Sequence, residues 1–110
     1  MLKYRIVYYT LPSGKIPVKK SIDSLPEKYQ TKVFNTFELL EEFGLFLGQP
    51  RVKKISGTPL WELRLLGEKS LRFIFIPRKN QELFILHSFV KKTNKTPKKE
   101  IKTALQRNSY

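Results

Sequence analysis

Three short apolar runs separated by turns, at residues 60–66, 71–77 and 83–90, dominate the second half of the chain. They are rich in leucine, isoleucine and phenylalanine, and only a few residues, 67–69 and 79–81, join them. Apolar runs bounded by turn residues are typical of strands, and connections this short favour antiparallel pairs. This half of the chain is therefore predicted to form a small, curved antiparallel sheet.

The first half of the chain predicts a strand followed by two helices. Residues 4–9 are β-branched and aromatic, which favours a strand. Pro17 opens a short helix that runs through Ser24, and residues 24–27 match a capping box at the start of a second helix. An apolar stripe recurs at helical spacing in that second helix, at Tyr29, Val33, Phe37 and Leu40, and Gly44 closes it.

Two further elements complete the predicted fold. Residues 52–55 are expected to form a short strand or the entry to one. Thr96 and Pro97 are expected as N-cap and first residue of a C-terminal helix that packs through Ile101, Leu105 and Ala104. A chain of 110 residues is long enough for one core of helices on a sheet and too short for two. The prediction is one α+β domain that spans residues 1–110.

The charge of the chain is strongly positive and uneven. The 22 Lys and Arg against 9 Asp and Glu give a net charge of +13. Residues 1–50 carry 7 basic and 5 acidic side chains, whereas residues 51–110 carry 15 basic and 4 acidic ones, so the net charges are +2 and +11. This imbalance favours a polyanionic partner bound by the second half, and the alternative is a solubilising lysine-rich surface.

Composition excludes several classes of protein. Without cysteine there is no disulfide framework and no thiolate nucleophile. A single His and scattered carboxylates match no metal-binding motif, so any catalysis is expected to need neither metal nor cofactor. No apolar stretch is long enough to span a membrane and no signal-peptide pattern is present, so a cytoplasmic protein without membrane partners is expected.

Cations on the predicted strands converge on one face. Positions two apart on a strand share a face, which places Arg64 with Glu62, and His87 with Leu83, Ile85 and Phe89. In-register pairing would bring Arg64, Arg72 and His87 together. The basic residues Lys91 and Lys92 would lie at the end of this face and Lys53 and Lys54 at its rim. Such a cluster suits a phosphodiester whose negative charge grows in the transition state.

Each of these residues also has a structural interpretation. Arg64 and Arg72 could form ion pairs with Glu62 or Glu68, because cross-strand charge pairs are common. His87 could be a hydrogen-bonded core histidine, and Trp61 a core residue instead of a platform for base stacking. The remaining basic candidates, Lys91, Lys92, Lys95, Lys98 and Lys99, could be a solvated face.

Four segments carry a resemblance to a known family: Leu60-Trp61-Glu62-Leu63-Arg64, Leu71-Arg72-Phe73-Ile74-Phe75, residues 86–97, and Glu100-Ile101. Together they resemble the RelE/ParE toxin superfamily, and most closely its phage-derived HigB-like branch in type II toxin–antitoxin systems. The resemblance implies a RelE-like fold, in which a curved antiparallel sheet packs against an N-terminal helical hairpin and a C-terminal helix follows.

The resemblance also implies an activity. HigB-like proteins resemble ribosome-dependent mRNA endoribonucleases that inhibit translation and cleave without metal through attack by the RNA 2′-hydroxyl. Carried over by position, Arg64 and Arg72 would neutralise the scissile phosphate, Lys91 or Lys92 would supply a further cation, and Lys53 and Lys54 would contact ribosomal RNA. RelE members place a tyrosine where this chain has Lys98 and Lys99, so His87 is the candidate for proton transfer.

The implied partners are a HigA-like antitoxin with a helix-turn-helix domain, the ribosome with its mRNA, and operator DNA bound through the antitoxin complex. Two alternatives remain open at this point. One is a ParE-like toxin that poisons gyrase without nuclease activity, and the other is a nonenzymatic RNA-binding module.

Overall fold

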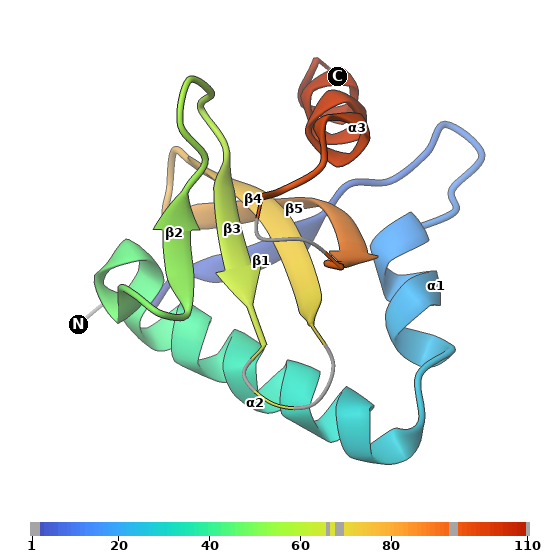
Figure 1. Cartoon of the computed structure of the whole chain (residues 1–110), viewed down its shortest axis with the longest axis vertical. Helices are drawn as coiled ribbons and strands as arrows, with labels where there is room; N and C mark the ends of the chain where they lie inside the picture. The colour runs from blue at the N-terminus through green and yellow to red at the C-terminus, as the bar shows by residue number, and fades with distance from the viewer. Residues whose placement is uncertain (1–2, 66, 68–69, 93–94, 110) are drawn as a thin grey trace.

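The computed structural model describes residues 3–65, 67, 70–92 and 95–109. Along the chain the elements are β1 (Arg5–Tyr8), α1 (Pro17–Asp23), α2 (Glu27–Phe43), the 3-10 helix η1 (Gly44–Leu47), β2 (Val52–Lys54), β3 (Trp61–Arg64), β4 (Leu71–Arg78), β5 (Glu82–Val90) and α3 (Lys98–Asn108). The class is α+β, as predicted (Figure 1).

The strands form one five-stranded sheet in the order β1-β5-β4-β3-β2. The pairs β2–β3, β3–β4 and β4–β5 are antiparallel, which confirms the expectation from the short connections between them. The expectation of a wholly antiparallel sheet is wrong, because β1 pairs with β5 in parallel, with Arg5 opposite Glu82. Helices α1 and α2 lie between β1 and β5 in the sequence. No short connection therefore constrains the relative direction of these two strands.

One face of the sheet is covered by α1 and α2. Val33, Phe37 and Leu40 of α2 are buried there, and the ring of Phe37 meets Phe73 of β4 edge-on at 5.0 Å between centroids. The predicted apolar stripe of α2 is therefore core. Gly44 ends the helix as predicted, with a positive φ of 56°.

The junction of the two helices differs from the prediction. The Ser24 hydroxyl donates to the carbonyl of Ser21, so it closes α1 and no capping box forms. Gln30 holds the turn, because its Nε2 donates to the carbonyls of Asp23 and Leu25 at 3.1 and 2.8 Å. In Figure 1, α2 runs along the sheet and α1 rises from its end, so the two helices do not form the expected side-by-side hairpin.

The opposite face of the sheet carries α3. A second core forms there from Leu60, Ile74, Leu86 and Ala104 with their neighbours, and Ile101 packs against it. The expectation that Leu105 packs as well is wrong, because its side chain is exposed. Pro97 is the N-cap and Lys98 the first residue of α3, one residue later than predicted. The helix lies over β5, with the C-terminus at the upper end of the view in Figure 1.

An irregularity in β5 decides which face His87 occupies. On β4, Ile74 lies opposite His87 while the next residue, Phe75, lies opposite Ile85, so Leu86 is an extra residue in the ladder. Such a bulge reverses the alternation of side chains beyond it. The expectation that His87 shares a face with Leu83 and Ile85 is wrong, because those two lie in the core beneath α1 and α2.

No helix among the described residues is long and apolar enough to cross a membrane. Over the same part of the chain, no group of three or more His, Asp or Glu side chains comes together as metal ligands would.

Candidate nucleic-acid interface

A buried carboxylate, Glu62 of β3, lies on the face of the sheet that carries α3. It is 6% exposed and gathers three partners from different elements. Its Oε1 lies 3.1 Å from Nε of Arg72 and 3.6 Å from Nζ of Lys91, and its Oε2 accepts a hydrogen bond from the Thr96 hydroxyl. Glu62 therefore ties β3 to β4, to the residue after β5, and to the approach to α3.

The Arg72 guanidinium is buried behind this carboxylate. The side chain is 5% exposed, and besides Glu62 it donates from Nη1 to the carbonyl of Leu71 at 3.3 Å. Burial lowers the pKa of Arg72, and the charge of Arg64 lowers it further, while Glu62 acts in the opposite direction. The ion-pair interpretation of Arg72 is confirmed, and a ligand cannot reach this guanidinium without displacing its neighbours.

Arg64 lies directly across from Arg72 in the β3–β4 pair. Its side chain is partly exposed, and it forms no ion pair with any residue that the structure describes. The structure therefore brings the two arginines together as predicted and gives them different surroundings. Arg72 is buried and paired, whereas Arg64 is partly exposed and unpaired among the described residues. The expected alternative partner Glu68 lies outside the described residues.

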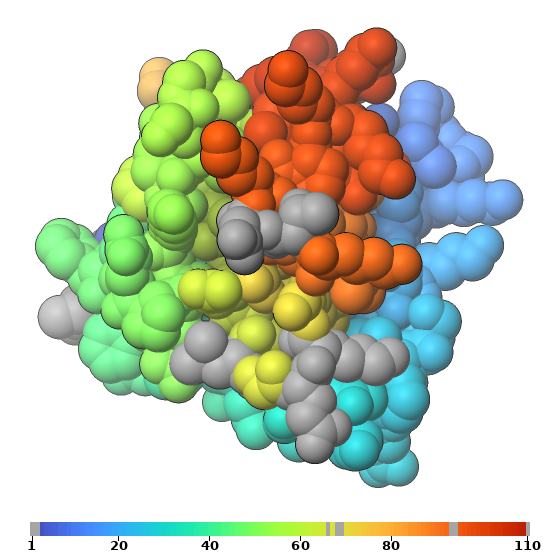
Figure 2. Space-filling model, in the orientation of Figure 1, coloured from blue at the N-terminus to red at the C-terminus, as the bar shows by residue number. Residues whose placement is uncertain are grey.

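A groove opens beside Glu62, between the β2–β3 hairpin and the start of α3, with a volume of about 410 Å³. We call it the Glu62 groove. Figure 2 shows the face of the molecule on which the hairpin meets the residues leading into α3. The lining residues are Lys53, Lys54, Ile55, Ser56, Glu62, Lys91, Lys95, Thr96 and Ile101.

The groove gathers some of the predicted RNA-binding lysines and not others. Lys53 lies directly opposite Glu62 in the register of β2 and β3, so the side chain of Lys53 is on the same face as the groove. Lys54 also lines the groove, but its Nζ donates to the carbonyl of Thr58 and lies 5.9 Å from the Trp61 ring centroid. The exposed lysines Lys92, Lys98 and Lys99 are not among the groove residues.

Trp61 points away from the Glu62 groove. It precedes Glu62 on β3 and so faces the other side of the sheet, where it packs against the core beneath α1 and α2. This placement favours the core interpretation of Trp61 over base stacking.

His87 is held by two side chains of α3. Its Nε2 lies 2.9 Å from Oε1 of Glu100, and its Nδ1 lies 3.3 Å from Nη1 of Arg107. A guanidinium can only donate, so Nδ1 is the acceptor and the proton lies on Nε2, where Glu100 accepts it. Both ring nitrogens are occupied, as the core interpretation of His87 requires.

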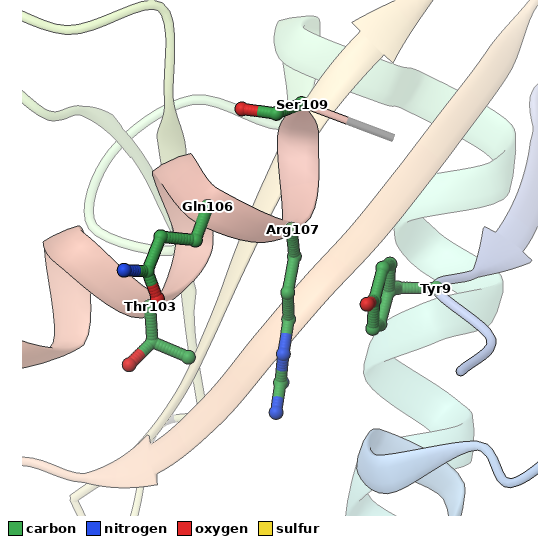
Figure 3. A pocket seen from close by; sticks show the side chains of 5 residues that line it. All are labelled: Tyr9, Thr103, Gln106, Arg107 and Ser109. Atoms are coloured by element: carbon green, nitrogen blue, oxygen red, sulfur yellow. The ribbon is translucent and has the colours of Figure 1, made fainter. Parts of the chain in front are cut away.

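Arg107 completes this contact. Its Nη1 also donates to the carbonyl of Leu86 at 2.9 Å, the extra residue of the bulge. Figure 3 shows Arg107 extending from α3 beside Tyr9, at the hollow that these two residues line with Thr103, Gln106 and Ser109. His87 thus belongs to the docking of α3, whereas Arg64 and Arg72 belong to the sheet next to the Glu62 groove.

The sequence patterns predict Glu62 only as a possible ion-pair partner and Thr96 as a helix cap. One signal in the sequence does indicate the cluster around Glu62. A charged residue inside an apolar strand needs a charged partner on the same face. Glu62, with Arg64 two positions on and Arg72 on the next strand, satisfies that condition.

The fold and the groove define a basic α+β protein with lysines gathered along one groove of its surface. By sequence, residues 20–109 match the family described as phage derived protein Gp49-like (DUF891), and the chain belongs to this family. The Gp49-like family is toxin-like and part of the RelE/ParE-like toxin superfamily. The predicted resemblance to this superfamily is therefore confirmed. No curated protein gives a significant match.

Proposed function

We propose that this protein is the toxin of a type II toxin–antitoxin pair and acts as a ribosome-dependent mRNA endoribonuclease of the HigB-like branch. The observation that carries the proposal is the placement of Arg64. This partly exposed cation has no ion-pair partner among the described residues and lies next to Arg72, on the face of the sheet that carries Glu62. Membership of a superfamily whose RelE-type toxins are often endoribonucleases supports the same conclusion.

In the proposed reaction the RNA supplies its own nucleophile. The 2′-oxygen forms a bond to the adjacent phosphorus while the bond from phosphorus to the 5′-oxygen breaks. The 2′-hydroxyl loses its proton to a base and the departing 5′-oxygen gains one, which leaves a cyclic phosphate and a 5′-hydroxyl. Negative charge grows on the phosphate oxygens, so a preorganised cation beside them lowers the barrier, and no metal ion is needed.

Arg64 is the residue that we propose to contact the scissile phosphate. Arg72 supports it from behind, because its buried guanidinium holds Glu62 and so fixes the strand pair that carries Arg64. Lys92, exposed just after β5, is a second candidate for a phosphate contact. Removal of one such donor typically costs about 3 kcal/mol of transition-state stabilisation.

The proton-transfer role suggested for His87 is not part of this proposal. Both ring nitrogens of His87 are hydrogen-bonded to side chains of α3. The ring could therefore transfer a proton to RNA only if α3 moved away from the sheet. In this proposal the general base and the general acid are supplied by the ribosome, the RNA or solvent.

Lysines of the groove and of α3 would hold the ribosome and its mRNA. Lys53, Lys91 and Lys95 line the groove, and Lys98 and Lys99 begin α3. Such contacts with phosphates supply affinity without reading the sequence. As its cellular partner we propose a HigA-like antitoxin whose helix-turn-helix domain would bring the complex to operator DNA.

The proposal is tested with purified components. A defined mRNA is incubated with the protein in the presence or absence of translating ribosomes and with EDTA-treated protein, and the RNA ends are mapped. We expect cleavage only with ribosomes, unaffected by EDTA pretreatment of the toxin, and lost in Arg64→Ala. Intact mRNA together with inhibited supercoiling by gyrase would replace the proposal with the ParE-like function, and RNA binding without either effect would leave a binding module.

A further inference from the structure

The Glu62 groove combines three kinds of surface that a simple phosphate site does not need. Lysines stand at its rim, the apolar side chains of Ile55 and Ile101 contribute to its walls, and the carboxylate of Glu62 lies at its base. Its volume of about 410 Å³ falls in the range of small-molecule sites. The question is which part of a nucleotide such a groove would accept.

A phosphate is disfavoured near Glu62. Both groups are negative, and Arg72 and Lys91, the cations closest to the base of the groove, already interact with the carboxylate. Lys53 has no ion pair with a described residue, and it lies on the groove face opposite Glu62. A backbone phosphate is therefore expected to stay at the rim, near Lys53.

A nucleobase suits the interior better. A base is neutral, presents apolar faces to Ile55 and Ile101, and carries N–H donors on its edge. The Glu62 carboxylate offers about four acceptor sites, of which Arg72, Lys91 and Thr96 use three. The remaining site is on Oε2, where Thr96 is the only partner among the described residues.

Resting on the proposed function, we propose that the Glu62 groove binds one base of single-stranded RNA, with the phosphate at the lysine rim. Glu62 then accepts a hydrogen bond from the base and favours a base with an exocyclic amino group. Glu62 becomes a specificity-determining residue, and the rim lysines bind every sequence alike.

Cytosine and uracil give the sharpest comparison. They are the same size, and at position 4 cytosine has an amino donor where uracil has a carbonyl acceptor. A carboxylate accepts from the amino group and repels the carbonyl. One hydrogen bond to a charged carboxylate corresponds to a preference of about tenfold or more for cytosine.

The test measures binding of fluorescent RNA hexamers, C6 and U6, to the full chain at one fixed salt concentration, without ribosomes. Wild type should bind C6 more tightly than U6 by about tenfold or more. In Glu62→Gln the ratio should fall to near one, because an amide can donate to uracil as well as accept from cytosine. Glu82→Gln is the matched control, since Glu82, like Glu62, pairs with two cationic side chains but lies outside the groove, and it should keep the preference.

A second measurement covers the case in which Glu62→Gln does not fold. Hexamers that carry 5-iodocytidine are crosslinked to wild type by light, and the attached peptide is identified by mass spectrometry. Crosslinks at residues 53–56 or 95–101 would support the inference, and crosslinks elsewhere would overturn it. Lys53→Glu should weaken both hexamers equally and leave their ratio unchanged.

The outcomes separate this inference from the proposed function. Equal binding of C6 and U6 by wild type would overturn the inference, whether or not the protein cleaves mRNA on ribosomes. A preference for C6 that depends on Glu62, in a protein that does not cleave mRNA on ribosomes, would support the base site and overturn the nuclease proposal.

Discussion

Nε of Arg72 donates a hydrogen bond to Oε1 of Glu62 at 3.1 Å, and both side chains are buried within the sheet. Neither charge has free access to water, so each depends on the other for its stability in the folded state. Through Lys91 and Thr96 the same carboxylate also reaches the residues that lead into α3. This pair organises the face that we propose to meet RNA.

Substitution of Glu62 alone should destabilise the protein more than substitution of Glu62 and Arg72 together. Glu62→Leu leaves Arg72 buried without its counter-charge and should lower the free energy of unfolding by about 3 kcal/mol or more. The double variant Glu62→Leu, Arg72→Met should recover most of that loss, because neither charge remains to be desolvated. Urea denaturation of the variants measures both. Glu82→Leu, at the exposed pair with Arg5, should have a far smaller effect.

His87 is predicted to stabilise the docking of α3. In His87→Leu, Glu100 and Arg107 lose their shared partner, which should cost about 1–3 kcal/mol. Hydrogen exchange in α3 should accelerate, while exchange in α2 should not. Glu100→Gln, whose amide oxygen can still accept from Nε2, should show a smaller effect. Unchanged exchange of α3 in His87→Leu would contradict this role.

Tyr8 should make the protein sensitive to alkali. Burial raises the pKa of Tyr8, and the charges of Glu41 and Asp23 raise it further. A raised pKa in the folded state gives stability that is fully present below pH 10, the pKa of an ordinary tyrosine, and is lost as pH rises through the folded-state pKa. Tyr8→Phe cannot ionise, so its stability should fall less between pH 9 and pH 11. Parallel curves for the two proteins would refute this prediction.

Gly44 should tolerate no side chain. Its φ is 56°, and a Cβ there would lie 2.5 Å from Cε2 of Tyr4. Gly44→Ala should therefore lose about 2 kcal/mol or more of unfolding free energy. The control is Gly57→Ala, where φ is 76° but nothing lies within 4 Å of the added atom, so only the backbone strain remains. Equal losses in thermal or chemical denaturation would show that the Tyr4 contact does not matter.

Local sequence signals predicted most of the elements. Alternating and helical apolar patterns, turn residues and Gly44 were enough to predict the antiparallel strands, α2 and the C-terminal helix, because these features depend on neighbours close in sequence. The direction of β1 did not follow from the sequence. Its partner β5 lies more than 70 residues away, with Arg5 opposite Glu82, so no connection length constrains the pairing.

The candidate site was also predicted only in part, because some of its contacts follow from local strand patterns and others join residues far apart in the chain. Arg64 and Arg72 were expected together because strand register and alternation bring them opposite each other. The bulge at Leu86 turned His87 toward α3, and no local signal announces one extra residue in a strand. Thr96 was expected to cap a helix, but its hydroxyl bonds to Glu62, a contact between residues far apart in the chain.

The most direct test of the central claim is a map of RNA 5′ ends in bacteria shortly after induction of this protein, with Arg64→Ala as the matched variant. The account predicts new 5′-hydroxyl ends within translated messages, in register with codons, and their loss in Arg64→Ala at equal protein level. Growth arrest without such ends, or the same ends in both proteins, would contradict it.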